Sequence, residues 1–342
     1  MSSEGRIEEF ELIARVFAPL AAGQPFAKGL IDDAAVISPE MGHDLVVTTD
    51  TLSAGIHFRD DDPPETVAAR ALAANVSDLA AMGAMPVGYT LAIAAPAGLS
   101  IEWYEAFANR LAAEQERYGI GLLGGDTTSM HGGPSLTITA IGQVPQGRAI
   151  LRSTGREGDD LWVTGTIGDA ALGLDILESR LKPAAAPDGE SLTARFVSPV
   201  ARIGVVGLLQ RHATSAIDVS DGLLSDIGHL AAASAVAAMV DQDQVPVSPA
   251  ARRLLEQPGM GGRSLWRRLV TGGDDYEVVF TAATADRAAI EADAQSLDFP
   301  VSRIGRLVAK GGEIADDLVV VRDASGAIVH IDGPHGYRHF AD

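Results

Sequence analysis

The chain has 342 residues, enough for two domains at roughly 150 residues each. It carries 26 Lys and Arg against 46 Asp and Glu, a net charge of −20, and this balance argues against nucleic-acid or anionic-membrane partners, which need a basic surface. Cysteine is absent, which excludes disulfides, thiolate zinc sites and a cysteine nucleophile.

Periodic apolar spacing in the N-terminal half predicts three helices, over residues 6–20, 66–82 and 102–118. Apolar or alternating runs predict three strands, over residues 45–50, 88–95 and 135–144. The strand over 45–50 is predicted to end in Thr48, Thr49 and Asp50. The glycine pair after Leu123 predicts a tight loop over 124–128.

Residues 145–159 are rich in Pro, Gly and Arg, and we place the domain boundary there, with an N-terminal domain over 1–147 and a C-terminal domain over 148–342. The second half predicts strands near 160–164, 214–219, 276–282 and 317–322, and helices near 200–212, 222–235 and 284–296. Residues 183–190 are predicted as a surface loop. Strands and helices do not alternate strictly, so we expect an α/β (α+β) fold with mixed sheets rather than one doubly wound sheet.

Aspartates repeatedly follow an apolar run or a glycine-rich turn. The segments are Asp32-Asp33, Thr48-Thr49-Asp50, Asn75-Val-Ser-Asp78, Gly124-Gly-Asp-Thr127, Asp218-Val-Ser-Asp-Gly222 and Gly272-Gly-Asp-Asp275. Taken singly, each has an ordinary use: Asp78 as a solvated helix residue, Asp126 as a turn residue or N-cap, and Asp218 and Asp221 as helix caps. Taken together, carboxylates gathered at one place would repel one another unless cations lay between them.

Carboxylates and hydroxyls are hard oxygen ligands that suit Mg²⁺. Only three lysines are present and none lies in a P-loop motif, so metal ions would supply the positive charge that phosphates need. The residues therefore predict a multi-metal, phosphate-handling site. His57 is either a surface-loop residue or a substrate contact, and Arg152 is either a solvated linker charge or a phosphate clamp.

These motifs, in this order over nearly the whole chain, resemble the thiamine-monophosphate kinases, a family within the aminoimidazole-ribonucleotide-synthetase-like superfamily of ATP-using enzymes. Gly55-Ile-His-Phe58 and Gly336-Tyr-Arg-His-Phe340 fit the resemblance as well. It implies transfer of the γ-phosphoryl group of ATP to thiamine monophosphate, giving thiamine diphosphate. It also implies an N-terminal mixed α/β domain that forms a homodimer interface, a C-terminal α+β domain and an active site in the cleft between the domains.

Residue roles are carried over by this resemblance, position by position. The implied magnesium ligands are Asp33, Thr48, Thr49, Asp50, Asp78, Asp126, Asp218 and Asp221. The implied ATP contacts are Gly125, Asp126, Arg152 and Ser220, and the implied substrate contacts are His57, Asp274 and Tyr337. The implied catalytic residues are Asp50, Asp126 and Arg152. The family often has Glu at the position of Asp274, and its usual Gly-Ile-Gly reads Gly29-Leu30-Ile31 here.

A phosphate monoester has a second pKa near 6, so the acceptor oxygen is largely anionic at pH 7 and needs no general base. Several Mg²⁺ ions and Arg152 would neutralise and align the phosphates for direct in-line transfer. The alternatives are another ATP-using enzyme of the superfamily, or a non-catalytic nucleotide- or metal-binding protein. No secretory signal or transmembrane run is visible, so we expect a cytoplasmic protein with no membrane partner.

Overall fold

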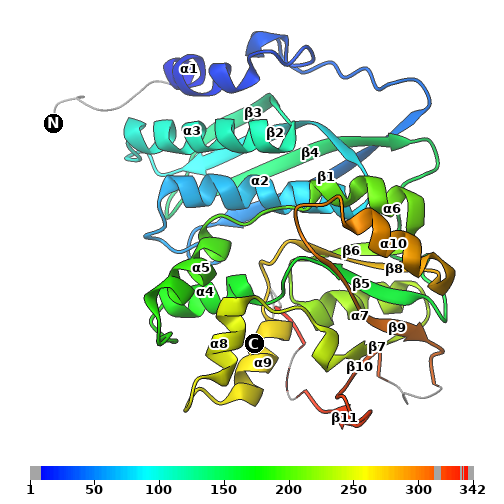
Figure 1. Ribbon diagram of the computed structural model, residues 1–342. Helices are drawn as coiled ribbons and strands as arrows, with labels where there is room; N and C mark the ends of the chain where they lie inside the picture. Colours follow the sequence, from blue (N-terminus) through cyan, green and yellow to red (C-terminus); the bar gives the residue numbers. More distant parts are fainter. Residues whose placement is uncertain (1–8, 312–316, 332, 334, 338–342) are drawn as a thin grey trace. The chain divides into compact units, whose positions relative to one another are not determined.

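The computed structural model describes residues 9–311, 317–331, 333 and 335–337. The chain divides into two compact units: unit 1 comprises Met1–Leu79 and Ala84–Ala149, and unit 2 comprises Ala80–Gly83 and Ile150–Asp342 (Figure 1). Each unit has helices and one mixed sheet, so the expected mixed α/β class is confirmed. Within the described ranges, no helix is both long and apolar enough to cross a membrane.

Unit 1 is built on a four-stranded sheet of order β1-β4-β2-β3, in which β2 and β3 are parallel and the other neighbours antiparallel. The strands are β1 (His43–Ser53), β2 (Met85–Ala95), β3 (Leu122–Ser129) and β4 (Ser135–Pro145). The helices α2 (Pro64–Ala81) and α3 (Ile101–Tyr118) lie along one face of the sheet (Figure 1). Before β1 come α1 (Glu9–Leu12), a π-helical turn η1 (Ile13–Phe17) and the 3₁₀ turns η2 (Ala18–Ala21) and η3 (Lys28–Leu30).

Helix α3 forms where its periodicity predicts it. Ser100 caps its first turn by accepting a hydrogen bond from the Trp103 backbone N–H, and Gly119 ends it in the left-handed conformation at φ 63°. Phe107 and Leu111, four residues apart, are both fully buried. The predicted helix over 102–118 is thus confirmed.

The predicted tight loop over 124–128 is wrong, because these residues form part of β3. A Cβ on Gly125 would lie 2.0 Å from the Leu91 carbonyl oxygen. The glycine therefore allows β3 to approach β2 closely, a use of glycine that differs from a turn.

Strand β1 also runs further than predicted, so Thr48, Thr49 and Asp50 lie within it and not at its end. Its second half is polar and pairs through hydroxyl contacts with β4. The contacts are Thr49 to Thr139 at 2.9 Å, Thr51 to Thr137 at 2.8 Å and Ser53 to Ser135 at 3.0 Å. Cross-strand hydroxyl pairs of this kind stabilise a strand that apolar patterning does not reveal.

Unit 2 is built on a seven-stranded sheet of order β11-β10-β7-β9-β5-β8-β6, in which β7 and β10 are parallel and the other neighbours antiparallel. The strands are β5 (Asp160–Thr164), β6 (Ala213–Val219), β7 (Ala237–Asp241), β8 (Glu277–Ala282), β9 (Val301–Val308), β10 (Val319–Arg322) and β11 (Ile328–Val329). The helices are α4 (Asp169–Leu177), α5 (Ala186–Val197), α6 (Val206–His212), α7 (Leu223–Ala233), α8 (Pro249–Glu256), α9 (Gly262–Thr271) and α10 (Arg287–Ala294). The described part of unit 2 also contains the 3₁₀ turns η4 (Ile203–Val205), η5 (Gln242–Gln244) and η6 (Thr284–Asp286).

The strands predicted in this half correspond to β5, β6, β8 and β10, and the predicted helices to α6, α7 and α10. The surface loop predicted over 183–190 is wrong in its second part, because α5 begins at Ala186. Pro187 falls in its first turn, where a missing N–H costs no hydrogen bond. The buried face of α5, with Leu192 and Phe196, lies beyond the polar stretch that suggested a loop.

Candidate functional site

A cavity of about 170 Å³ lies beside the edge strand β3 of unit 1. Its polar wall brings Asp33 together with Gly125 and Asp126, which are far apart in the sequence. The apolar wall includes Phe17 and Leu91. Two of the predicted acidic motifs therefore meet at one cavity that also has room for an apolar group.

A second group of predicted ligands lies where β1 meets α2. The Thr48 hydroxyl donates a hydrogen bond to the Asp78 carboxylate. Asp50 follows Thr48 by two residues, so its side chain points to the same face of the strand. Asn75, one turn earlier on α2, is fully buried, and its Nδ2 donates to the Ala71 carbonyl oxygen at 3.0 Å. Within the described part of the chain, no donor lies within hydrogen-bond distance of Asn75 Oδ1.

These two groups lie at opposite edges of the sheet. Asp50 pairs with Ile138, Ile138 pairs with Leu91, and Leu91 pairs with Gly125, so Asp50 and Gly125 share one row. Three strand spacings separate them by roughly 14 Å along the sheet. Ligand oxygens lie about 2.1 Å from Mg²⁺. Asp50 and Asp126 of one chain therefore cannot hold the same ion.

Thr49 is not brought together with Thr48, Asp50 and Asp78. Strand alternation turns its side chain to the face opposite Thr48 and Asp50. Its hydroxyl there donates to the Ile138 carbonyl oxygen at 3.0 Å and lies 2.9 Å from the Thr139 hydroxyl.

His57 lies in the turn that follows β1. Its Nδ1 accepts a hydrogen bond from the Ser53 backbone N–H at 3.1 Å, and its carbonyl oxygen accepts one from Arg70 at 2.8 Å. These contacts fix the ring and leave Nε2 as the nitrogen that carries the proton in the neutral form.

In unit 2, two segments converge on the loop that follows β6. The Asp274 backbone N–H donates to the Ser220 carbonyl oxygen at 2.9 Å, and the Tyr337 N–H donates to the Asp221 carbonyl oxygen at 3.0 Å. A Cβ on Gly273 would lie 2.2 Å from the Ser220 carbonyl oxygen, so this approach requires glycine. The structure thus brings together five predicted residues: Asp218, Ser220, Asp221, Asp274 and Tyr337.

Asp226 shapes this loop, although the sequence analysis did not select it. Its carboxylate is buried, with 3% exposed, and accepts hydrogen bonds from the backbone N–H groups of Ser220, Asp221 and Gly222, each at 3.1 Å. Burial, with the nearby Asp221 charge, raises the Asp226 pKa to about 7, against the lowering effect of the backbone hydrogen bonds. The sequence signal that could have identified Asp226 is its position four residues after Gly222, in the first turn of the following helix.

Arg152 is anchored away from this loop. Its carbonyl oxygen accepts a hydrogen bond from Ser234, just past the end of α7, at 2.7 Å. Thr154, two residues later, donates to the carbonyl oxygen of Thr214, near the start of β6, at 2.6 Å. The acidic loop follows the opposite end of β6, whose seven residues span roughly 20 Å. Unit 2 therefore does not bring the Arg152 backbone to Asp221.

The donor set fits magnesium. The predicted ligands in both units are mostly carboxylates, together with the Thr48 hydroxyl. Mg²⁺ prefers such oxygens and keeps several of its waters. The buried Asn75 Oδ1 on the Asp78 helix offers an acceptor that a metal-bound water would satisfy. In unit 2, Asp221, Asp226 and His229 each place a ligand atom within 4.8 Å of the others.

Comparison with known proteins gives consistent results. Sequence profiles described as AIR synthase related protein, N-terminal domain and C-terminal domain, match residues 31–144 and 156–317. The chain is 40% identical to the thiamine-monophosphate kinase of Escherichia coli over 97% of this chain and 98% of that protein.

Solved structures agree with the sequence relatives. A thiamine-monophosphate kinase from Stenotrophomonas maltophilia aligns with TM-score 0.80 and 41% identity, over 92% of this chain and 96% of that one. A structure described as AaThiL complexed with AMPPCP and TMP aligns with TM-score 0.75 and 28% identity, over 99% of this chain and 100% of that one.

Proposed function

Because this chain belongs to the thiamine-monophosphate kinase family, we propose that it transfers the γ-phosphoryl group of ATP to thiamine monophosphate and so forms thiamine diphosphate. The observation that carries the proposal is the convergence in unit 2 of Ser220, Asp221, Asp274 and Tyr337. It puts implied metal and ATP contacts beside implied substrate contacts. We place the reaction in the cytoplasm, whose reducing conditions suit a chain without cysteine.

We assign ATP to the cavity beside β3. The apolar wall with Phe17 and Leu91 suits a nucleobase, and the Gly125 backbone beside Asp126 suits the phosphates. Ser220 and Arg152 of unit 2 stay proposed ATP contacts on the strength of the family resemblance.

We assign Mg²⁺ to the carboxylates and to the two threonine hydroxyls that the family resemblance implies. The proposed ligands are Asp33, Thr48, Thr49, Asp50, Asp78, Asp126, Asp218 and Asp221. When bound, the ions neutralise the phosphates of both substrates and align them for transfer.

The protein's own part in the reaction is positioning. The acceptor phosphate is already largely anionic at pH 7, so none of these residues has to remove a proton from it. Asp274, His57 and Tyr337 would hold thiamine monophosphate, and Arg152 would stabilise the charge of the transferring group. Transfer is direct: the acceptor oxygen bonds to the γ-phosphorus, the bond from that phosphorus to the β,γ-bridging oxygen breaks, and ADP leaves, with no phospho-enzyme.

We further propose a homodimer in which Asp126 of one copy joins Asp50 of the other. One chain holds these two residues at opposite edges of its sheet, which supports a second copy completing the set. The sheet face opposite α2 and α3 exposes 41% of Leu45 and 61% of Val47. Apolar side chains in such a position suit burial in a symmetric interface.

The test is an assay of the purified chain with ATP, Mg²⁺ and thiamine monophosphate, with thiamine diphosphate measured by chromatography. We expect one thiamine diphosphate for each ADP formed. ATP consumption with a different acceptor would instead identify another enzyme of the superfamily. ATP binding without turnover on any acceptor would identify a nucleotide-binding protein.

A further inference from the structure

Two residues at the proposed substrate site have a backbone conformation that side chains rarely adopt. Asp274 has φ 73° and Tyr276 has φ 50°, both in the left-handed region. Such a conformation costs a non-glycine residue energy and persists only where the surroundings fix it. Their backbone N–H groups donate to the carbonyl oxygens of Ser220 at 2.9 Å and Val219 at 2.9 Å. The strained segment is therefore tied to the loop that carries Asp221.

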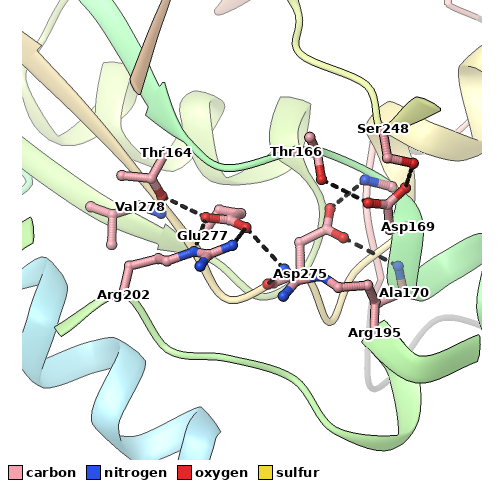
Figure 2. A network of polar contacts seen from close by, with 11 residues as sticks. Thr164, Thr166, Asp169, Ala170, Arg195, Arg202, Ser248, Asp275, Glu277 and Val278 are labelled. Carbon is pink, nitrogen blue, oxygen red and sulfur yellow. Dashed lines mark hydrogen bonds and ion pairs between the residues drawn. The ribbon is translucent and has the colours of Figure 1, made fainter. Parts of the chain in front are cut away.

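The first anchor of this segment is Glu277, whose side chain is fully buried. Its carboxylate accepts two hydrogen bonds from Arg202, both at 2.6 Å, and one from Arg195 at 2.9 Å. The Thr164 hydroxyl donates a further one at 2.7 Å (Figure 2). A bidentate arginine pair of this kind fixes the carboxylate, and with it the backbone at 277.

The second anchor is Asp275, which lies between the two strained residues and is also fully buried. Its carboxylate accepts hydrogen bonds from the backbone N–H groups of Gly168 at 2.7 Å and Ala170 at 3.4 Å, at the start of α4 (Figure 2). Its carbonyl oxygen accepts one from Arg195 at 3.3 Å. The buried side chains of Asp275 and Glu277 thus fix the backbone of this segment. The side chains of Asp274 and Tyr276, which alternate with them, contact each other.

The Tyr276 hydroxyl donates a hydrogen bond to Asp274 Oδ1 at 3.2 Å. The tyrosine side chain is 6% exposed, so its packing fixes the position of the hydroxyl. An aspartate carboxylate that receives such a bond has fewer accessible rotamers than a free one. The hydrogen bond therefore fixes the direction in which the carboxylate faces a ligand.

We propose that Tyr276 is a positioning residue for thiamine monophosphate, which acts by orienting the Asp274 carboxylate. The inference rests on the proposed function, since Asp274 is the substrate contact. Asp is one methylene shorter than the Glu often found at this position. An Asp carboxylate therefore reaches the substrate over a narrower range of directions than a Glu carboxylate would. Tyr276 has no contact with ATP in this scheme, and its effect is confined to the thiamine substrate.

The experiment is Tyr276→Phe in the full chain, with steady-state kinetics for each substrate and a melting curve. The ring stays and only the hydroxyl is lost. We expect KM for thiamine monophosphate to rise about fivefold, the scale of one net intramolecular hydrogen bond. We expect kcat and KM for ATP to stay within about twofold, and the melting temperature to change little. Tyr104→Phe, which alters another tyrosine that is 6% exposed, serves as the control and should leave both KM values unchanged.

A double-mutant cycle separates orientation from general packing. In an Asp274→Ala background, Tyr276→Phe should raise KM for thiamine monophosphate no further. An equal rise in both backgrounds, or no rise in either, would overturn the inference while leaving the proposed function intact. Failure of the unaltered chain to form thiamine diphosphate would overturn the proposed function, and the inference with it.

Discussion

The alternation of side chains along β1 divides its proposed ligands between the two faces of the sheet. Thr48 and Asp50 face α2, where Asp78 lies, whereas Thr49 faces the uncovered side of the sheet. Three consecutive residues that form one motif in the sequence are thus divided between two environments. A residue's chemical type alone does not give its role here.

At the same scale, we expect Asp50→Asn and Asp126→Asn each to lower kcat at least about 100-fold in a folded protein. The substitution keeps the shape and removes the charge that would hold metal, and one preorganised electrostatic contact is worth about that much. Turnover assays and melting curves check this. Asn caps a turn or helix about as well as Asp, so near-normal turnover in both variants would mean that the residues only shape the backbone.

We expect Asp274→Ala to weaken the binding of thiamine monophosphate and not that of ATP. Thiamine is cationic at its thiazolium ring, and loss of a charge-assisted contact should raise KM for thiamine monophosphate about tenfold or more. KM for ATP should change little. Kinetics with each substrate varied test this assignment. A fall in kcat with altered Mg²⁺ dependence would point instead to a metal ligand, and equal KM increases for both substrates would refute the assignment.

At the scale of elements, the site in unit 2 is made where loops touch backbone to backbone. The loop after β6 and the segment before β8 approach so closely that Gly273 has no room for a side chain. Asp226 at the start of α7 fixes the first loop through three backbone N–H groups, and Asp275 fixes the second on the start of α4. The start of α7 thus supplies an acceptor for the N–H groups of one loop, and the start of α4 supplies N–H donors for the other.

Gly273→Ala tests this close approach. The new Cβ would lie 2.2 Å from the Ser220 carbonyl oxygen, so the two loops must separate. We expect kcat/KM for thiamine monophosphate to fall at least about tenfold, since small displacements at a positioned site are costly, and the melting temperature to fall. The control is Gly98→Ala, where a Cβ would meet no atom within 4 Å. In this variant kcat/KM and the melting temperature should stay unchanged. Equal behaviour of the two variants would contradict the proposed contact.

At the scale of the whole molecule, the sheet of unit 1 separates two halves of the proposed metal set, and a second copy offers the simplest way to unite them. Light scattering at micromolar concentration should give about twice 35.5 kDa. Mixing and reassociating Asp50→Asn and Asp126→Asn chains tests the shared site directly. Half the dimers would then be mixed, each with one intact site, so we expect about a quarter of normal activity. A fully active monomer, or no recovery on mixing, would count against the proposal.

Dependence on metal is the other expectation at this scale. The chain has 46 acidic residues and few lysines, so the proposed reaction needs cations to bring two phosphate-bearing substrates together. Excess EDTA should abolish turnover, and added Mg²⁺ should restore it. The melting curve should show that the chelated protein remains folded, and full activity in EDTA would exclude the multi-metal scheme.

The sequence by itself determined the elements with strong local signals, and it predicts the chemistry of the site residues. Helix α3 follows from its spacing and its Ser100 cap, and the recurring aspartates indicate metal-assisted phosphate chemistry. Tertiary structure alone decided the rest. The strands β7 and β9 pair inside a sheet without clear alternation, and β1 extends through hydroxyl pairs whose partners lie some 90 residues away. The division of the aspartates between sheet edges, and the contact of Tyr276 with a strained Asp274, arise from long-range pairing and burial, which local spacing does not encode.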